Sequence, residues 1–211
     1  MSLRFRIEMG RSEDARRKVL DAGVQLILSD GVPSFTVEAV AKRSGVAKTT
    51  IYRHWPDPDV LLIDTLRSTI QAIPTPNTGS LQDDLEQLLA TLAPCDDHAA
   101  AEQIRILFGV LQRAAGDEAL RAAFDDMMRE RFGPIRTVLE LAQARGDIDS
   151  HLDLDLGVDL VIGPLLHRHL MRRQSVDPAV TATIVRHVIA GLCPRDTTGR
   201  PGHASPATPL R

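Results

Sequence analysis

Residues 36–55 contain two short helical segments separated by a glycine turn, and this spacing constrains the fold more than any other feature. Thr36 supplies a capping hydroxyl for the first segment, and Gly45 follows its end. Two helices that meet at a steep angle need a tight reversal, and glycine adopts the required positive φ at low cost. Residues 47–55 form the second segment. Together with a longer segment that starts at Ser12, they predict a three-helix helix-turn-helix unit.

The rest of the chain is also helical in pattern. Hydrophobic residues make up 43% of the 211 residues and aromatic residues only 3%, so the core consists mainly of Leu, Val, Ile and Ala. This composition favours helices over sheets, because strand-rich proteins usually depend on aromatic and β-branched residues. Apolar residues at helical spacing predict six further helices. These lie at residues 59–73, 80–92, 98–115, 117–145 (with a bend at Gly133-Pro134), 155–173 and 178–192. We therefore expect an all-α fold of about nine helices.

Breaks in the helical pattern suggest the domain organisation. Residues 1–11 are polar and basic without periodicity, and we expect a mobile arm. We expect one domain at 1–58, which contains the helix-turn-helix, and a larger helical domain at 59–193. The segment 74–79, rich in proline, is the sharpest interruption. Residues 194–211 are rich in Pro, Gly, Ser and Thr, which predicts a disordered tail.

Charge is unevenly distributed along the chain. The net charge is −3, yet residues 1–55 carry ten Lys or Arg against six Asp or Glu, and the remainder is acidic. A basic end on an acidic body favours an N-terminal module that faces nucleic acid. An excess of this size is also typical of an ordinary solvated surface, so the helix-turn-helix motif carries the argument.

Other sequence features bear on location. No apolar stretch approaches the roughly 20 residues that span a bilayer, and the N-terminus lacks the apolar segment of a signal peptide. The only cysteines are Cys95 and Cys193, which are too few for a disulfide framework and fit a reducing compartment. We expect a cytoplasmic protein without a membrane partner.

The segment FTVEAVAKRSGVAKTTIYRHWPDPDVLL, residues 35–62, resembles the DNA-binding signature of the tetracycline-repressor (TetR) family. The likeness covers residues 12–63, and its TIYRHW ending is rarely seen outside that family. Residues 104–148 are similar to a common C-terminal subtype. The resemblance implies a dimeric transcriptional regulator, in which the domain at 1–58 binds DNA and the domain at 59–193 binds a ligand and forms the dimer. Members often carry a Lys at the start of the fourth helix; this chain has Pro58, so we expect no phosphate contact there.

The second helix of such a motif presents its first turn to base edges in the major groove. Lys48 can donate to guanine O6 and N7, and Thr49 can offer its hydroxyl or its methyl group to thymine. Donor side chains at the margins of the groove are expected to contact phosphates and hold the register. These residues are Thr36, Thr50, Tyr52 and His54.

Several of these residues have a structural alternative. Ile51 and Trp55 lie on the inner side of their helix, and we expect them in the core. Tyr52 is either a phosphate contact, as the resemblance implies, or a half-buried packing residue. His54 has the same two interpretations. Residues 42–43, Lys and Arg, add non-specific attraction to DNA or form only the solvated end of a helix.

The C-terminal part carries no recognisable catalytic constellation. His167 and His169 are two residues apart, so on a helix they point in different directions and cannot chelate one metal ion. Cys95 and Cys193 have no CxxC partner, which disfavours metal binding and redox sensing. We therefore expect neither an enzyme nor a bound cofactor.

Gly163-Pro164 interrupts the most apolar helical segment. Proline removes one helical hydrogen bond and frees the carbonyl of Leu160. The pair is either a tolerated kink or a bend that lines a ligand cavity or shapes a dimer seam. The TetR resemblance places the dimer contact in residues 155–192, where two helices would pair with those of a second copy.

These features together predict a ligand-responsive transcriptional regulator. We expect a repressor that binds a palindromic operator on double-stranded DNA as a homodimer. An unidentified small hydrophobic effector, entering between roughly residues 81 and 170, would release it. Two alternatives stay open: an enzyme or cofactor-binding domain with an incidental helix-turn-helix, and a helix-turn-helix that serves as a protein-interaction scaffold.

Overall fold

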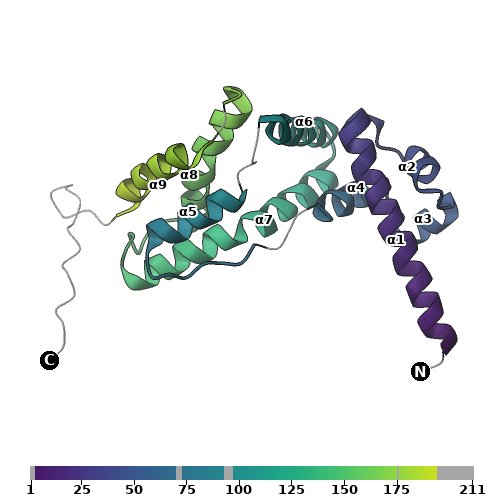
Figure 1. The fold of residues 1–211 in the computed structure, drawn as a ribbon, viewed down its shortest axis with the longest axis horizontal. Coiled ribbons are helices and arrows are strands. Elements are labelled where there is room, and N and C mark those ends of the chain that lie inside the picture. The colour runs from purple at the N-terminus through teal and green to yellow at the C-terminus, as the bar shows by residue number, and fades with distance from the viewer. Residues whose placement is uncertain (1–2, 70–72, 93–96, 175, 194–211) are drawn as a thin grey trace. The chain divides into compact units, whose positions relative to one another are not determined.

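The computed structural model describes residues 3–69, 73–92, 97–174 and 176–193, and within these ranges all regular secondary structure is helical. They contain nine α-helices and no strand, as predicted (Figure 1). The helices are α1 (Leu3–Asp30), α2 (Val37–Ser44), α3 (Lys48–His54), α4 (Pro58–Arg67), α5 (Leu81–Leu92), α6 (Asp97–Arg113), α7 (Glu118–Arg145), α8 (Leu154–Leu166) and α9 (Pro178–Leu192). A short 3-10 turn at Val32–Ser34 and a π-helical segment at His167–Met171 complete the described elements.

The chain divides into two compact units, each with its own core. One contains residues 1–72 and 102–131, and the other contains residues 73–101 and 132–211. The first boundary between the two units lies between residues 72 and 73, beside the proline-rich segment that begins at Pro74. Helices α6 and α7 return part of the chain to the first unit, so the units do not follow the boundary placed after residue 58. The division into DNA-binding and ligand-binding domains stays a prediction.

The first unit contains the helix-turn-helix, with α2 and α3 beside α1 (Figure 1). Thr36 caps α2, because its side-chain oxygen accepts a hydrogen bond from the Ala39 N–H at 3.1 Å. Gly45 ends α2 with a φ of 69°, the left-handed conformation expected of the turn. The shared core combines aliphatic side chains with three aromatic ones, Phe35, Trp55 and Phe124. Its members from α1 to α4 include Val19, Ile27, Phe35, Val40, Ile51, Trp55, Leu61 and Leu62, and Val110, Leu120 and Phe124 come from α6 and α7.

Two predicted boundaries in this unit are wrong. Helix α1 begins at Leu3 rather than at Ser12, so residues 3–11 of the predicted arm are helical. Residues 3–11 contain no proline. Once the later turns of α1 have formed and packed, the helix can extend toward the N-terminus through these residues. Helix α4 ends at Arg67 rather than near Ile73, where the hydroxyls of Ser68 and Thr69 donate to the last carbonyl groups at 2.6 and 2.7 Å.

The second unit packs α5, α8 and α9 with the later part of α7. Helices α5 and α9 begin and end where the sequence predicted, at Leu81–Leu92 and Pro178–Leu192. Helix α8 is shorter than the predicted 155–173, because the chain becomes π-helical after Leu166. Buried aliphatic side chains fill this core, including Leu85, Leu88, Leu89, Ile135, Val138, Leu139, Val161 and Val185. The predicted tail at 194–211 and Cys95 lie outside the described residues.

Candidate nucleic-acid interface and ligand cavity

Helix α3 has one buried face and one solvent-facing face. Ile51 is completely buried and Trp55, just after the helix, is 2% exposed, so the prediction that both belong to the core is confirmed. On the other face, Lys48 and Thr49 are exposed and Tyr52 is 42% exposed. Because its apolar face is fixed in the core, α3 holds the polar side chains of its first turns toward solvent.

Lys48 forms an ion pair across the turn of the helix-turn-helix. Its Nζ lies 3.0 Å from Oε1 of Glu38 on α2, and both side chains are more than half exposed. This hydrogen bond holds the pKa of Glu38 below its ordinary value, with smaller contributions from a backbone hydrogen bond and from the charge of Lys48. Glu38 was not singled out from the sequence, and its pairing positions the predicted guanine contact before DNA is present.

The end of α3 is held by polar contacts with α1 and α4. The indole Nε1–H of Trp55 donates to Oδ2 of Asp64 at 2.9 Å, and the Arg16 guanidinium reaches the same carboxylate oxygen at 3.3 Å. Nε2 of His54 lies 3.3 Å from the hydroxyl of Ser12. His54 is therefore half-buried against α1 and is less free to reach a phosphate than Tyr52.

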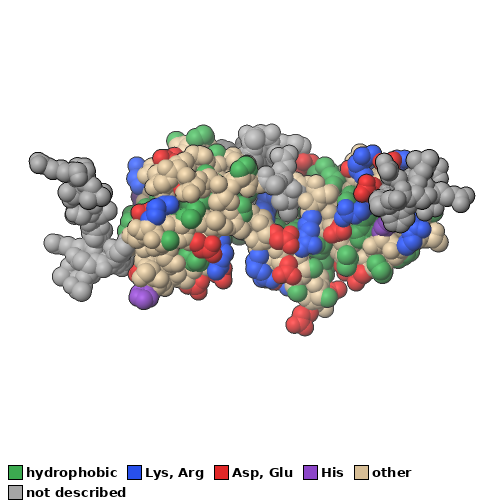
Figure 2. Space-filling model, turned by 90° about the horizontal axis from the view of Figure 1, so that it is seen from below, with side chains coloured by type: hydrophobic (Ala, Val, Ile, Leu, Met, Phe, Trp, Pro, Cys, Tyr) green, Lys and Arg blue, Asp and Glu red, His purple; other side chains and the backbone are tan. Residues whose placement is uncertain are grey.

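The remaining predicted contacts occupy different environments. Thr36 uses its oxygen lone pair to cap α2, which leaves its hydroxyl proton free to donate to a phosphate. Thr50 is half-buried. Arg43 donates to the hydroxyl of Ser29 at 3.0 Å and pairs with Asp30 at 3.4 Å, so it joins α2 to α1. On the face shown in Figure 2, basic and acidic side chains are interspersed rather than gathered into one basic patch.

Helix α6 is bonded to the helix-turn-helix within the first unit. The Arg113 guanidinium donates to Oδ1 of Asp59 at 2.7 Å and to the Phe35 carbonyl oxygen at 2.8 Å. Phe35 directly precedes the Thr36 cap, so this one side chain joins α6, the start of α2 and the start of α4. Close packing supports the contact: a Cβ at Gly109 would lie 2.8 Å from Cβ of Val32. Sequence patterns did not reveal these contacts.

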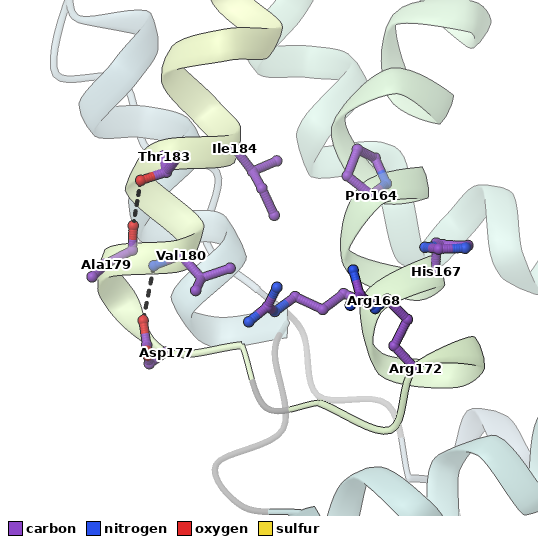
Figure 3. Close-up of a pocket in the computed structure, with 9 residues that line it drawn as sticks. All are labelled: Pro164, His167, Arg168, Arg172, Asp177, Ala179, Val180, Thr183 and Ile184. Carbon is purple, nitrogen blue, oxygen red and sulfur yellow. Dashed lines mark hydrogen bonds between the residues drawn. The ribbon is translucent and has the colours of Figure 1, made fainter.

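The second unit contains an open cavity of about 500 Å³ between the end of α8 and the start of α9 (Figure 3). Pro164 lines it, which supports the interpretation of Gly163-Pro164 as a bend beside a cavity. The other lining residues are His167, Arg168, Arg172, Asp177, Ala179, Val180, Thr183 and Ile184. The predicted ligand region, residues 81–170, therefore overlaps the α8 side of this cavity but not its α9 side.

Helix α8 also exposes large apolar side chains. Leu156 is 52% exposed and Leu160 is 43% exposed, one helical turn apart, and Leu166 is 38% exposed. Such a row is unfavourable in water and is typical of a surface that another apolar surface covers.

Metal-ligand clusters and membrane-spanning helices are both absent from residues 3–69, 73–92, 97–174 and 176–193. In these ranges no group of three or more His, Cys, Asp or Glu side chains could hold a metal ion. His167 is exposed whereas His169 is buried, so the two do point in different directions, as predicted. Within the same ranges no helix is both long and apolar enough to cross a bilayer.

Comparisons with known proteins agree with this geometry. Residues 19–64 match the family described as "Bacterial regulatory proteins, tetR family", and residues 75–188 match "Tetracyclin repressor-like, C-terminal domain". The uncharacterized HTH-type transcriptional regulator YdeS of Bacillus subtilis is 28% identical over 86% of this chain and 91% of its own length. The HTH-type transcriptional regulator AqdR of Rhodococcus erythropolis is 31% identical over 72% of each chain.

A solved structure gives the same result. The TetR family transcription regulator SCO0332 superposes with a TM-score of 0.62 and 31% sequence identity, over 86% of this chain and all of that one. The fold and the exposed face of α3 thus define a helix-turn-helix transcriptional regulator. More specifically, the chain belongs to the tetR family of bacterial regulatory proteins.

Proposed function

We propose that this protein is a ligand-responsive repressor that binds a palindromic operator as a homodimer. The observation that carries the proposal is the arrangement of α3. Its inner face is fixed by Ile51 and Trp55, and Lys48, Thr49 and Tyr52 face solvent. A short helix held in this way can enter the major groove and present its first turn to base edges.

The proposed DNA contacts fall into two groups. Lys48 and Thr49 would contact bases and so carry sequence preference. Donors around them would contact phosphates and fix the register of α3 in the groove. This second group contains Thr36, Thr50, Tyr52 and, with less freedom because of Ser12, His54.

The homodimer proposal rests on α8 and α9. Leu156 and Leu160 form an exposed apolar row on α8, and residues 155–192 would pair with the same helices of a second copy. A two-fold axis between two copies would place two α3 helices on successive half-sites, which is why we expect a palindromic operator.

We infer repression, and a location in the bacterial cytoplasm, from the kind of regulator that the family contains. A small effector with an apolar part would release the DNA by binding one conformation more tightly than the other. A difference of about 1–3 kcal/mol is enough to change operator affinity about 5- to 150-fold.

The salt dependence of binding tests the DNA-binding proposal. We would titrate the full chain into a pool of fluorescent random duplexes and measure anisotropy at 50–300 mM salt. Affinity should fall steeply as salt rises, because each phosphate contact releases a counterion. A protein-interaction scaffold, or an enzyme with an incidental helix-turn-helix, would show no binding to duplex DNA at any of these concentrations.

A further inference from the structure

Helix α3 is too short to set its own direction. It contains seven residues, Lys48–His54, and a helix of about two turns depends on tertiary contacts for its stability. Ile51 anchors the middle of α3 in the core, and Trp55 anchors its end. The direction of α3, and with it the position of Lys48, therefore depends on what holds Trp55.

The buried Trp55 side chain is held by one acceptor. It is 2% exposed, and its indole N–H can only donate a hydrogen bond. Oδ2 of Asp64 on α4 accepts this hydrogen bond at 2.9 Å. Without Asp64 the indole would be a buried donor with no partner, which is unfavourable, so the end of α3 is fixed at this carboxylate.

The same carboxylate oxygen also binds α1. The Arg16 guanidinium donates to Oδ2 of Asp64 at 3.3 Å, and its Cζ lies 5.9 Å from the centre of the Trp55 ring, within reach of a cation–π contact. The Asp64 side chain is only 25% exposed, so solvent screens these contacts in part. Three side chains, from α1, from α4 and from the end of α3, thus form a closed set of contacts.

Asp64 is itself held in a fixed position on α4. Its neighbour Thr65 packs so closely on α1 that a Cβ at Gly23 would lie 2.8 Å from Oγ1 of Thr65. Thr65 is completely buried, and its hydroxyl donates to the Leu61 carbonyl oxygen at 2.7 Å. Because α1 and α4 approach this closely beside Asp64, its carboxylate provides a fixed point from which to hold Trp55.

We propose that Asp64 is a positioning residue for DNA recognition, which sets the direction of α3 by holding Trp55 against α1 and α4. Ile51 lies between Lys48 and Trp55, and α3 rises about 1.5 Å per residue, so a shift of about 1 Å at Trp55 would move Lys48 by a similar distance. Hydrogen bonds to base edges tolerate a spread of only about 0.5 Å. Attraction to phosphates does not depend on such precision.

Asp64 should therefore govern sequence preference rather than overall attraction to DNA. This inference rests on the proposed function, in which α3 contacts the bases. Its test is the ratio of two affinities, one for a duplex that the wild-type chain selects from a random pool and one for random duplexes. Fluorescence anisotropy with the full chain gives both affinities.

Two variants of Asp64 should differ in this ratio. Asp64→Ala should lower the affinity for the selected duplex about tenfold, the size of one lost base contact. Its affinity for random duplexes should stay within about twofold of the wild-type value. Asp64→Asn should recover most of the loss, because the amide oxygen can still accept the indole N–H.

Asp14→Ala is the matched control. Asp14 pairs with Arg17 at 2.9 Å and its side chain is 61% exposed, so this variant removes the same charge from an aspartate–arginine pair that lies within α1. Equal affinities of Asp64→Ala and Asp14→Ala for the selected duplex would refute the positioning role. An equal loss on selected and random duplexes for Asp64→Ala would also refute it, because a general structural defect would act on both.

The indole N–H of Trp55 reports the contact directly, without DNA. Trp55 is the only tryptophan of the chain, so isotope-labelled protein gives a single indole N–H resonance. Hydrogen exchange at this group should be faster in Asp64→Ala than in the wild-type chain and nearly unchanged in Asp64→Asn, because the hydrogen bond protects it. Unchanged exchange in Asp64→Ala would show that Asp64 does not hold Trp55.

Failure of this inference can be told from failure of the proposed function. If the wild-type chain selects no duplex, the proposed function is wrong and the positioning role falls with it. If the wild-type chain selects a duplex and Asp64→Ala keeps the full preference for it, only the positioning role is wrong.

Circular dichroism shows whether Asp64→Ala folds. If it does not, Asp64→Asn is compared with Asp14→Asn, because both keep the shape of the side chain and lose its charge. Loss of the Arg16 pair should then lower the preference of Asp64→Asn for the selected duplex about threefold. Equal preferences of these two variants would refute the positioning role.

Discussion

Lys48 at the start of α3 and Glu38 on α2 form an ion pair 3.0 Å long across the turn of the helix-turn-helix. Glu38 therefore orients Lys48, the residue proposed to contact a base. When α3 enters the groove, the Glu38 carboxylate would also approach the DNA phosphates. DNA must share or replace this pairing, so the two residues should influence operator binding in opposite directions.

Lys48→Ala should lose about 1–3 kcal/mol of binding free energy on the selected operator and much less on random duplexes. Glu38→Gln should strengthen binding to both, because it removes a negative charge near phosphates and frees the Lys48 ammonium group. Fluorescence anisotropy with both kinds of DNA measures the two effects. An equal loss on operator and random DNA for Lys48→Ala would show that Lys48 contacts the backbone rather than a base.

The Arg113 contact should stabilise the first unit. Arg113→Met removes the hydrogen bonds to Asp59 and Phe35, and we expect a loss of about 1–2 kcal/mol in the free energy of unfolding. The Arg113 and Asp59 side chains are only 26% and 24% exposed, so solvent screens this pair less than a surface pair. Urea denaturation measures the change.

Arg121→Met is the matched control for this contact, because Arg121 pairs with Asp125 on the same helix and its side chain is 58% exposed. Its loss should be about 0.5 kcal/mol or less. Equal losses for the two variants would show that the bridge from α6 to the helix-turn-helix contributes no more than a surface ion pair.

Arg131 should reduce stability rather than add to it. Burial lowers the pKa of this guanidinium, which lies on α7 one and two turns after Met127 and Phe124, both core residues. The lowered pKa means that folding disfavours the charged form. Arginine nevertheless stays charged across the accessible pH range, so the cost is present at pH 7.

Replacing the charge should therefore stabilise the protein. We expect Arg131→Met to raise the free energy of unfolding by about 1 kcal/mol, measured by urea denaturation at pH 7. Arg129→Met, a substitution of an exposed arginine on the same helix, is the comparison and should change little. A loss of stability in Arg131→Met would mean that the native state uses the Arg131 charge.

The exposed row on α8 gives a prediction about assembly. Leu160→Glu should convert the proposed dimer into monomers, because it places a charge in the middle of an apolar contact. Leu28→Glu tests a similarly exposed leucine on α1, outside residues 155–192, and should leave the dimer intact. Light scattering coupled to size exclusion gives the mass of each variant. A dimer that survives Leu160→Glu would place the pairing surface elsewhere.

Local signals in the sequence predicted most of the fold. Thr36 and Gly45 mark the ends of α2, and Pro178 marks the start of α9, because caps and prolines act on their own turn. The start of α1 was missed because helix propagation, rather than a cap at Ser12, sets it.

Only part of the candidate DNA-binding surface was predictable, because local patterns do not encode contacts between residues far apart in the sequence. The inward direction of Ile51 and Trp55 follows from their spacing of four residues, one helical turn, at the end of α3. Arg113 contacts Asp59 and Phe35 across 54 and 78 residues of sequence, and such pairings depend on tertiary packing that no local pattern encodes.

Selection of bound duplexes from a random DNA pool, followed by sequencing and by measurement of the mass of the complex, tests the central claim most directly. The account predicts one enriched inverted repeat, with half-sites about one helical turn apart and two protein chains on each duplex. Replacing Lys48 should relax the preference at one base position in each half-site. No enriched sequence, or a single chain bound to an asymmetric site, would contradict it.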